Sequence, residues 1–337
     1  PISKTMSKKE LLKNIFTSKK RKNAIPYVTS YYKKKWGFCL SENQKKKLPN
    51  GKYKVYINSK FIKGHLDLSH AVLKGKSNKE IFFSSYCCHP SMANNELSGP
   101  VLLNAIFKKI KEKYKKTNYS YRFLLGPETI GSIAYLSKFK KTLKSNVICG
   151  FVLSCVGDNR AYSLISSRKE NTLADLSLKT VLKNKKNFNQ YSFLERGSDE
   201  RQFCSPGIDL PFAGFSRSKY GKYPEYHTSD DNLKIISEEN LQNSLKVFME
   251  IIESFELGIY PKYKFECEPQ LGKRGLYPNT SRIGVYTNIK DRMNFLAYSD
   301  GKNNLFEIAR KLDKPLNILL GEYRLLKKHN LIKSAYK

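Results

Sequence analysis

The sequence predicts an α/β protein whose main domain is a three-layer α/β/α sandwich, with a small β-rich module before it and a winged-helix domain after it. In the middle of the chain, apolar runs with strand character alternate with amphipathic, helix-like segments. This alternation is typical of a largely parallel sheet that is covered by helices on both faces. Near the C-terminus, two helix-like segments follow each other across a tight turn, which is the pattern of a helix-turn-helix unit.

The predicted N-terminal module spans residues 1–76 and has the character of a lid. It contains three short β-like runs, separated by turn-forming residues such as Pro49-Asn50-Gly51. The runs are YVTSYY, KYKVYIN and HAVLKG.

The main α/β domain is predicted over residues 77–262. Its strands are IFFSSYCC, YRFLLG, VICGFVLSCVG and a run near LPFAGF. Its helices are LSGPVLLNAIFKKIKEKY, SIAYLSKFKKTL, a segment around LADLSLKTVLKN, and SEENLQNSLKVFMEIIESF.

A linker is predicted over residues 263–284 and a winged helix over 285–337. Leu305, Ile308 and Leu312 keep a helical period, which Asp313-Lys314-Pro315 then interrupts. A second helix through LNILLGEYRLLKKHN and a final strand-like LIK complete the expected unit.

Composition excludes a disordered chain and predicts a cytoplasmic protein. Of the 337 residues, 40% are hydrophobic and 12% aromatic, which is enough for a sizeable core. No apolar run reaches the roughly 18 residues that a membrane span needs, and the N-terminus lacks the apolar part of a signal peptide. The seven cysteines are an odd number without the spacing of a zinc ribbon or a disulfide framework. Because the sequence does not begin with Met, we expect it to be part of a longer chain.

The formal net charge of +33 raises the question of a nucleic-acid partner. The excess is mostly lysine spread over all thirds of the chain, so we expect a solvated surface and no nucleic-acid partner. The alternative is a recognition helix from Leu316 to His329 that carries Arg324, Lys327 and Lys328. Its many leucines favour packing on the main domain. The sequence also leaves a homo-oligomer open.

Four polar residues follow predicted strands or precede the last helix of the main domain: His89, Glu128, Asp158 and His227. Ligands in open α/β sheets gather at the carboxyl ends of strands, so these side chains are expected to converge. Imidazoles and carboxylates are the ligands that zinc takes. Each residue also has a simpler explanation, because Glu128 could cap a helix and Asp158 could belong to a turn.

Several segments resemble known families. HPSMANNELSG, PETIGS and YHTSDDN are similar to signatures of the zinc aminopeptidases related to leucyl aminopeptidases and glutamate carboxypeptidases. Together with YVTSYYKKKWGFCLS, SDERQFCSPGIDLP and CEPQLGKRGLY, they resemble bacterial polysaccharide-biosynthesis proteins with an aminopeptidase-like domain and a C-terminal winged helix. The likeness runs in the same order from about residue 24 to the end.

This resemblance implies roles for individual residues. It implies that His89 and His227 bind zinc and that Glu128 is the general base. The next residue, a carboxylate ligand in the peptidases, is Thr129 here. Asp158 is the nearest match to a further metal ligand. The resemblance also places Asp199, Glu200 and Arg201 near the substrate pocket.

The largest departure from the peptidase pattern is Asn95, which stands where the pattern has the aspartate that bridges two metals. Its neutral carbonyl oxygen is a poorer zinc ligand, so one zinc ion is predicted and not two. Three alternatives remain open: one zinc held by His89, His227 and an acid; a site completed by Glu96; or an inactive relative.

The function expected from the resemblance is zinc-dependent hydrolysis of an amide in a surface-polysaccharide pathway. The substrate would be a small peptide or an acylated amino compound. A scaffold without activity and a winged-helix nucleic-acid-binding protein are the two alternatives.

Overall fold

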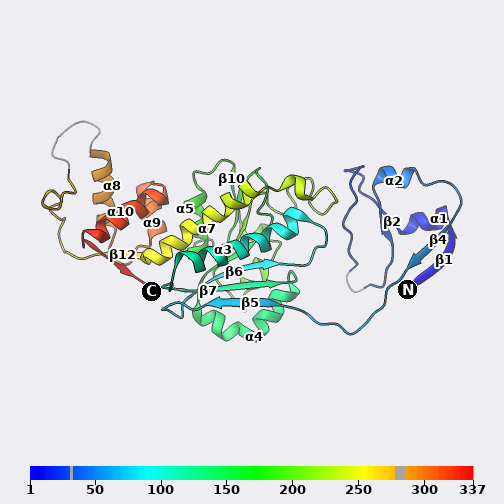
Figure 1. Ribbon diagram of the computed structural model, residues 1–337, viewed down its shortest axis with the longest axis horizontal. Coiled ribbons are helices and arrows are strands. Elements are labelled where there is room, and N and C mark those ends of the chain that lie inside the picture. The colour runs from blue at the N-terminus through cyan, green and yellow to red at the C-terminus, as the bar shows by residue number, and fades with distance from the viewer. Residues whose placement is uncertain (31–32, 278–285, 337) are drawn as a thin grey trace.

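The computed structural model describes residues 1–30, 33–277 and 286–336. The described chain forms a central α/β domain, with an N-terminal module at one end and a winged helix at the other (Figure 1). Strands β6 and β7 run towards the N-terminal module, so the carboxyl ends of the parallel strands face that module. The predicted fold class is therefore confirmed.

The central sheet has seven strands in the order β10-β9-β11-β8-β6-β7-β5. Strands β6, β7, β8 and β11 are parallel, and β5 pairs antiparallel with β7 at one edge. At the other edge, β9 and β10 are parallel to each other and antiparallel to β11. The strands are β5 (Ser69–Leu73), β6 (Glu80–Tyr86), β7 (Ser120–Gly126), β8 (Val147–Leu153), β9 (Tyr162–Ile165), β10 (Phe188–Tyr191) and β11 (Phe212–Ser216).

Helices cover both faces of this sheet. Successive side chains of a strand point to opposite faces, so Phe83 joins the core beneath α3 and α7, whereas Phe82 joins the core beneath α4 and α6. Helix α5 lies on the same side as α7 (Figure 1). The helices are α3 (Ser98–Lys113), α4 (Ile130–Asn146), α5 (Leu173–Leu182), α6 (Glu200–Phe203) and α7 (Glu238–Gly258).

The N-terminal module has its own small core, formed around Met6, Leu11, Ile15 and Val55. Strands β1 and β4 pair antiparallel, and the short strands β2 and β3 pair parallel. Its elements are β1 (Ile2–Ser7), α1 (Lys8–Leu11), β2 (Ile15–Phe16), β3 (Phe38–Cys39), α2 (Glu42–Lys46) and β4 (Lys52–Ile57).

The C-terminal unit is a winged helix, as predicted. Three helices pack together, and strands β12 and β13 form an antiparallel pair beside them. Leu319 and Tyr323 of this unit belong to the same buried cluster as Ile252 and Phe255 of α7. The unit therefore shares one hydrophobic core with the α/β domain. Its elements are α8 (Tyr286–Ala297), α9 (Leu305–Leu312), α10 (Leu316–Lys328), β12 (Tyr260–Tyr263) and β13 (Ile332–Ala335).

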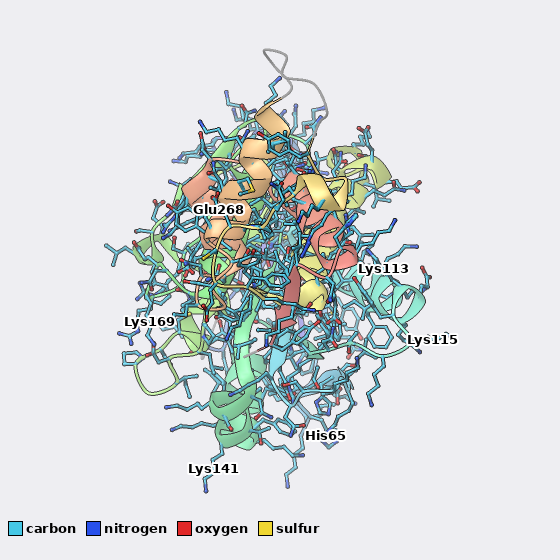
Figure 2. The ribbon with its side chains drawn as sticks, turned by 90° about the vertical axis from the view of Figure 1, so that its left-hand side faces the viewer. His65, Lys113, Lys115, Lys141, Lys169 and Glu268 are labelled. Atoms are coloured by element: carbon cyan, nitrogen blue, oxygen red, sulfur yellow. The ribbon has the colours of Figure 1, made fainter. Side chains whose placement is uncertain are left out.

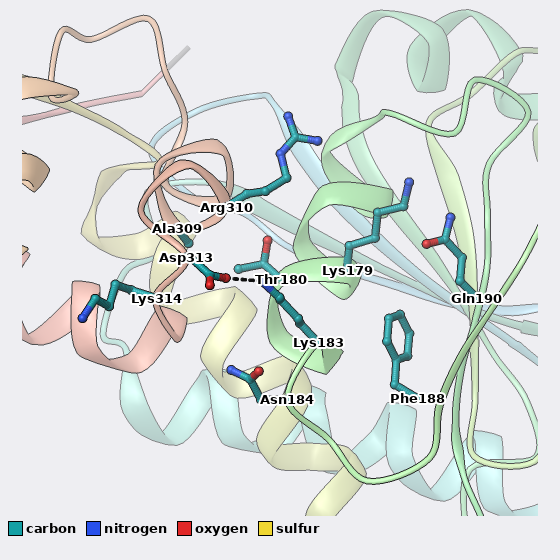
Figure 3. A pocket seen from close by; sticks show the side chains of 10 residues that line it. All are labelled: Lys179, Thr180, Lys183, Asn184, Phe188, Gln190, Ala309, Arg310, Asp313 and Lys314. Carbon is teal, nitrogen blue, oxygen red and sulfur yellow. Dashed lines mark hydrogen bonds and ion pairs between the residues drawn. The ribbon is translucent and has the colours of Figure 1, made fainter.

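A cavity of about 340 Å³ lies where α9 meets α5 and β10 (Figure 3). An ion pair between Lys183 and Asp313 links the two units there. Of the other cations that line it, Lys179 donates to the carbonyl of Glu170 and Lys314 pairs with Asp291. Helices α5 and α9, which line this cavity, lie towards the end of the molecule opposite the N-terminal module (Figure 1).

The domain boundaries differ from the predicted ones in two places. The run HAVLKG, predicted to belong to the N-terminal module, forms β5 of the main sheet. Residues 260–262, predicted to end the α/β domain, and residue 263, predicted to begin the linker, form β12 and pair with β13. In both places, pairing with a strand far away in the sequence determines which unit the segment joins. A local sequence pattern does not show such a pairing. Residues 278–285 of the predicted linker and winged-helix start lie outside the described residues, as do residues 31–32 of the run YVTSYY.

The lysines are distributed as the sequence predicts. Lys113, Lys115, Lys141 and Lys169 point outwards on different sides of the molecule (Figure 2). Lysines that point outwards in this way are solvated surface charges (Figure 2).

Candidate metal centre

Two histidines from distant parts of the chain meet at the carboxyl end of β6. The ring centroids of His89 and His227 are 5.1 Å apart. His89 follows β6 and is buried, with 7% of its surface exposed. His227 lies in the loop before α7. The carboxylate of Glu128, which follows β7, has one oxygen 4.0 Å from Nε2 of His89. The structure thus brings His89, His227 and Glu128 together, which are three of the four polar residues that the sequence analysis singled out.

Glu96 contacts the backbone and the Nδ1 side of His89. One oxygen of its carboxylate accepts the backbone N–H of Cys88, and the other accepts that of His89 at 2.8 Å. The second oxygen also lies 3.3 Å from Nδ1 of His89. A carboxylate at Nδ1 orients the ring so that Nε2 is presented to a metal. Glu96 therefore does not take the place of Asn95, and the alternative of a site completed by Glu96 is not supported by this geometry.

Cys88, His89 and Glu96 form a group of three ligand atoms that all lie within 4.8 Å of one another. The Cys88 sulfur is 3.1 Å from Nδ1 of His89. Both carboxylate oxygens of Glu96 already accept backbone hydrogen bonds, which leaves this group less suited to a metal than the Nε2 side of His89.

Two buried polar atoms lack a hydrogen-bond partner among the described residues: Nε2 of His227, whose ring lies next to that of His89, and Oδ1 of Asn95. Asn95 is 1% exposed, and its amide nitrogen donates to the hydroxyl of Tyr86 at 2.7 Å. Because buried polar atoms are normally satisfied, two such atoms mark a place where a ligand is expected. An imidazole nitrogen and an amide oxygen, together with Nε2 of His89, fit a metal cation.

Asp231 fixes the loop that carries Asn95. Its carboxylate accepts the backbone N–H groups of Ala93, Asn94 and Asn95 at 2.6 to 3.1 Å, and it accepts the hydroxyl of Tyr223 at 2.8 Å. No feature of the sequence marks Asp231 as such a contact, although it belongs to the segment YHTSDDN, which resembles a peptidase signature.

Asp158 does not join the two histidines. Oδ1 accepts the hydroxyl of Ser218 at 2.7 Å, and Oδ2 accepts the side chain of Asn94 at 3.0 Å. The backbone N–H groups of Arg160 and Ser218 complete its hydrogen bonds. Since all of these are structural contacts, the geometry does not support Asp158 as a metal ligand. The sequence pattern predicted that Asp158 follows a strand, but it did not predict the direction of its side chain.

The segment before α6 surrounds Glu128. The hydroxyl of Ser198 donates to Oε1 of Glu128 at 2.7 Å, which leaves Oε2 towards His89. Asp199 accepts the backbone N–H of Thr129 at 2.7 Å, and Arg201 donates to the Thr129 hydroxyl. The residues that the resemblance places near the substrate therefore lie against the expected base and its neighbour.

Glu200 is completely buried in this segment. Its Oε1 accepts the backbone N–H groups of Gly197 and Ser198 at 2.9 and 3.0 Å, and it also accepts the hydroxyl of Tyr220. Its Oε2 has no partner in the described part of the chain. This oxygen is a third unused buried acceptor close to Glu128.

Burial and neighbouring charges shift the protonation of the site. Burial raises the pKa of Glu128, although the Ser198 hydroxyl and His89 act against it. Burial lowers the pKa of His227 to about 4, and the charge of His89 contributes in the same direction. Burial also acts to lower the pKa of His89, but hydrogen bonds with Cys88 and Glu96 outweigh it and raise that pKa to about 10. At neutral pH His227 is therefore neutral, whereas His89 carries a proton that a cation bound at its Nε2 would displace.

Replacing Asp199 with Asn is expected to remove a pH-dependent loss of stability. Burial raises the pKa of Asp199 from 3.8 to about 7. The folded state therefore keeps a proton that the unfolded state releases, so the free energy of unfolding falls as pH rises from about 4 to about 7. Asp199→Asn stays neutral, and its stability should change less over this range. Urea unfolding at pH 5 and pH 8 measures the difference. Asp209→Asn, at a partly exposed carboxylate whose pKa is lowered, is the control. Equal pH dependence of Asp199→Asn and wild type would contradict the assignment.

The proposed recognition helix α10 packs inwards. Leu316, Leu319, Tyr323 and Leu326 are buried, and Arg324 pairs with Glu253 of α7. In the described part of the chain, no helix is both long and apolar enough to cross a membrane.

Comparison with known proteins gives two family matches. Residues 25–257 match DUF4910, a domain of unknown function, and residues 259–334 match a winged helix-turn-helix family. A curated relative from Clostridium acetobutylicum is 40% identical over 92% of this chain and 71% of its own length. It is described as a candidate polysaccharide-biosynthesis protein with an aminopeptidase-like domain.

One solved structure agrees with this result. A crystal structure of a candidate peptidase from Clostridium acetobutylicum has a TM-score of 0.89 and 36% identity, covering 99% of this chain and 76% of that one. A zinc aminopeptidase from Bacillus subtilis has a TM-score of 0.49 and 18% identity, with 69% of this chain and 61% of that chain covered.

Proposed function

Since the chain belongs to the DUF4910 family and to the polysaccharide-biosynthesis proteins with an aminopeptidase-like domain, we propose that it hydrolyses an amide bond with one zinc ion. The observation that carries this proposal is the pairing of His89 and His227 around unused buried acceptors, with Glu128 beside His89. We infer a small peptide or an acylated amino compound of a surface-polysaccharide pathway as the substrate.

Nε2 of His89, Nε2 of His227 and Oδ1 of Asn95 would hold the ion. One ion is proposed and not two, because Asn95 and Thr129 replace the carboxylates that a second ion would need. Zinc bound here would supply the Lewis acidity that polarises a carbonyl and makes water a nucleophile near neutral pH.

Glu128 supports the proton transfers. Its Oε2 faces His89 while Oε1 is held by Ser198, so the carboxylate has one oxygen fixed and one available. It would take a proton from the attacking water and give it to the leaving amine. The raised pKa of Glu128 suits a group that must both accept and release a proton.

The segment Ser198–Arg201 would position the substrate. Oε2 of Glu200 is an acceptor without a partner among the residues described, and it suits an N–H or O–H of the substrate. Arg201 is the neighbouring cation and would meet an anionic group. Asp199 holds the turn at Thr129 and acts through Glu128.

A scaffold without hydrolytic activity is the second candidate function, and Asn95 is the observation that favours it. Purified protein should be analysed for zinc and assayed for amide hydrolysis on the same sample. About one zinc per chain together with hydrolysis supports the enzyme. Protein without bound zinc and without activity supports the scaffold.

Asn95→Asp is expected to bind zinc about tenfold more tightly or better, because an anionic oxygen replaces a neutral one. A chelator competition measures the dissociation constant. Asn104→Asp adds the same charge at an exposed position of α3 and is the control. If both variants bind zinc equally, Oδ1 of Asn95 does not contact the ion.

A further inference from the structure

A segment of the N-terminal module, residues 21–27, lies directly along the loop that carries His227; we call it the strap. Pro26 pairs with Thr228 as an isolated antiparallel bridge. The backbone of Ile25 donates to the hydroxyl of Ser229 at 3.0 Å, and Ser229 donates back to the carbonyl of Ile25 at 2.8 Å. The guanidinium of Arg21 forms an ion pair with Asp230. The strap is thus fastened to three successive residues, 228 to 230.

The strap also holds His227 itself. The backbone N–H of Tyr27 donates to the carbonyl of His227 at 2.9 Å. His227 has a φ of +56°, in the left-handed region that a residue with a side chain avoids. Such a conformation persists only where surrounding contacts enforce it, and it gathers at functional sites. The strap supplies contacts on His227 and on the residues directly after it.

The ring of Tyr27 covers both imidazoles. Its centroid lies 5.6 Å from that of His89 and 5.3 Å from that of His227. The other tyrosine rings beside them, Tyr86 and Tyr226, belong to the main domain. Tyr27 therefore adds a wall to the site that the α/β domain alone does not have.

The strap is anchored at its other side to the N-terminal module. The backbone of Asn43 in α2 donates to the carbonyl of Lys22 at 3.1 Å. The module has a separate core and lies off the carboxyl end of the sheet (Figure 1). Contacts at the strap therefore tie a folded unit, and not a loose end, to the metal centre.

We propose that the strap is part of the active site, where it positions His227 and where Tyr27 limits the substrate to short molecules. This inference rests on the proposed function. It narrows the substrate class to a small amide, such as an acylated amino compound or a very short peptide. A polypeptide chain that must continue past both imidazoles would meet the Tyr27 ring.

Two variants at one position separate the two roles. Tyr27→Ala removes the ring but keeps the N–H that holds His227, whereas Tyr27→Pro removes both. Zinc affinity by chelator competition should be unchanged in Tyr27→Ala and about tenfold weaker in Tyr27→Pro. With alanine 4-nitroanilide as the short probe and labelled casein as the long one, Tyr27→Ala should raise the relative rate on casein about tenfold.

A second pair of variants tests the strap even if Tyr27→Pro does not fold. Arg21→Gln loosens the strap, and Arg168→Gln removes a similar ion pair, also made through Nε and Nη2, to Asp209 far from the strap. Arg21→Gln should weaken zinc binding and raise KM for the short probe, while Arg168→Gln should match wild type. The proposal is overturned if Tyr27→Pro and Arg21→Gln bind zinc like Arg168→Gln and Tyr27→Ala keeps the wild-type preference. Wild-type protein that neither binds zinc nor cleaves the short probe would instead overturn the proposed function.

Discussion

His89→Ala is expected to lose both zinc and amide hydrolysis. His89 supplies the buried Nε2 that faces Glu128 and lies beside His227, and alanine offers no ligand in its place. A mononuclear site with one of its two imidazoles removed should bind zinc at least 100-fold more weakly, since even partners outside the ligand shell contribute about 10- to 100-fold. Metal analysis after gel filtration and a chelator competition measure the loss.

His70→Ala is the matched control for this experiment. His70 lies on β5 and contacts the hydroxyl of Tyr135 at 3.0 Å, away from the metal centre. Its replacement should leave zinc content unchanged. If His89→Ala retained as much zinc as His70→Ala, the metal centre described above would be wrong.

Glu128→Gln is expected to keep zinc and lose hydrolysis. Glutamine preserves the size of the side chain and accepts the hydrogen bond from Ser198, but it cannot take a proton from water. Positioned acid–base groups contribute about 10²- to 10⁴-fold to rates, and kcat should fall by that factor. The rate on a small amide and the zinc content are measured on the same sample.

The exposed residue Glu112 provides the control for Glu128. It pairs with Lys109 on the surface of α3, so Glu112→Gln should have wild-type kcat and zinc content. A Glu128→Gln variant with unchanged kcat would assign the proton transfers to another group. Loss of zinc in that variant would make Glu128 a ligand and not a base.

The strands and helices of the α/β domain could be predicted because their patterns are local. Alternating strand and helix segments place β6, β7, β8 and β11 in a parallel sheet, and the structure confirms them. Strands β5, β9 and β10, which flank these four strands, depend on partners far away in the sequence. Membership of the central sheet could not be derived for them from local runs.

The metal centre could be predicted in part. His89 and Glu128 follow from their places at strand ends, because the topology of the sheet fixes where a strand end lies, and His227 follows from its place in the loop before the last helix of the domain. The direction of a side chain is not fixed in this way, and Asp158 turns to Ser218 and Asn94. Glu96 also required the structure, since only the backbone shows that its carboxylate accepts two N–H groups behind His89.

Asp231 and the strap were harder to predict for another reason. Both act on backbone groups, which every residue carries, so no particular side chain in the sequence marks their targets. Tyr27 reaches the site from the N-terminal module, and neither its spacing nor its residue type distinguishes it from the other tyrosines of the chain.

The buried cluster that joins α7 to the winged helix makes the two units interdependent. Phe255 packs on Phe306, and the hydroxyl of Tyr323 donates to the carbonyl of Gly258 at 3.0 Å. A chain cut after α7 would leave this apolar surface in water, where it would promote aggregation. The winged helix thus covers apolar residues at one end of the shared core. Heat or denaturant should therefore unfold both units in a single cooperative step.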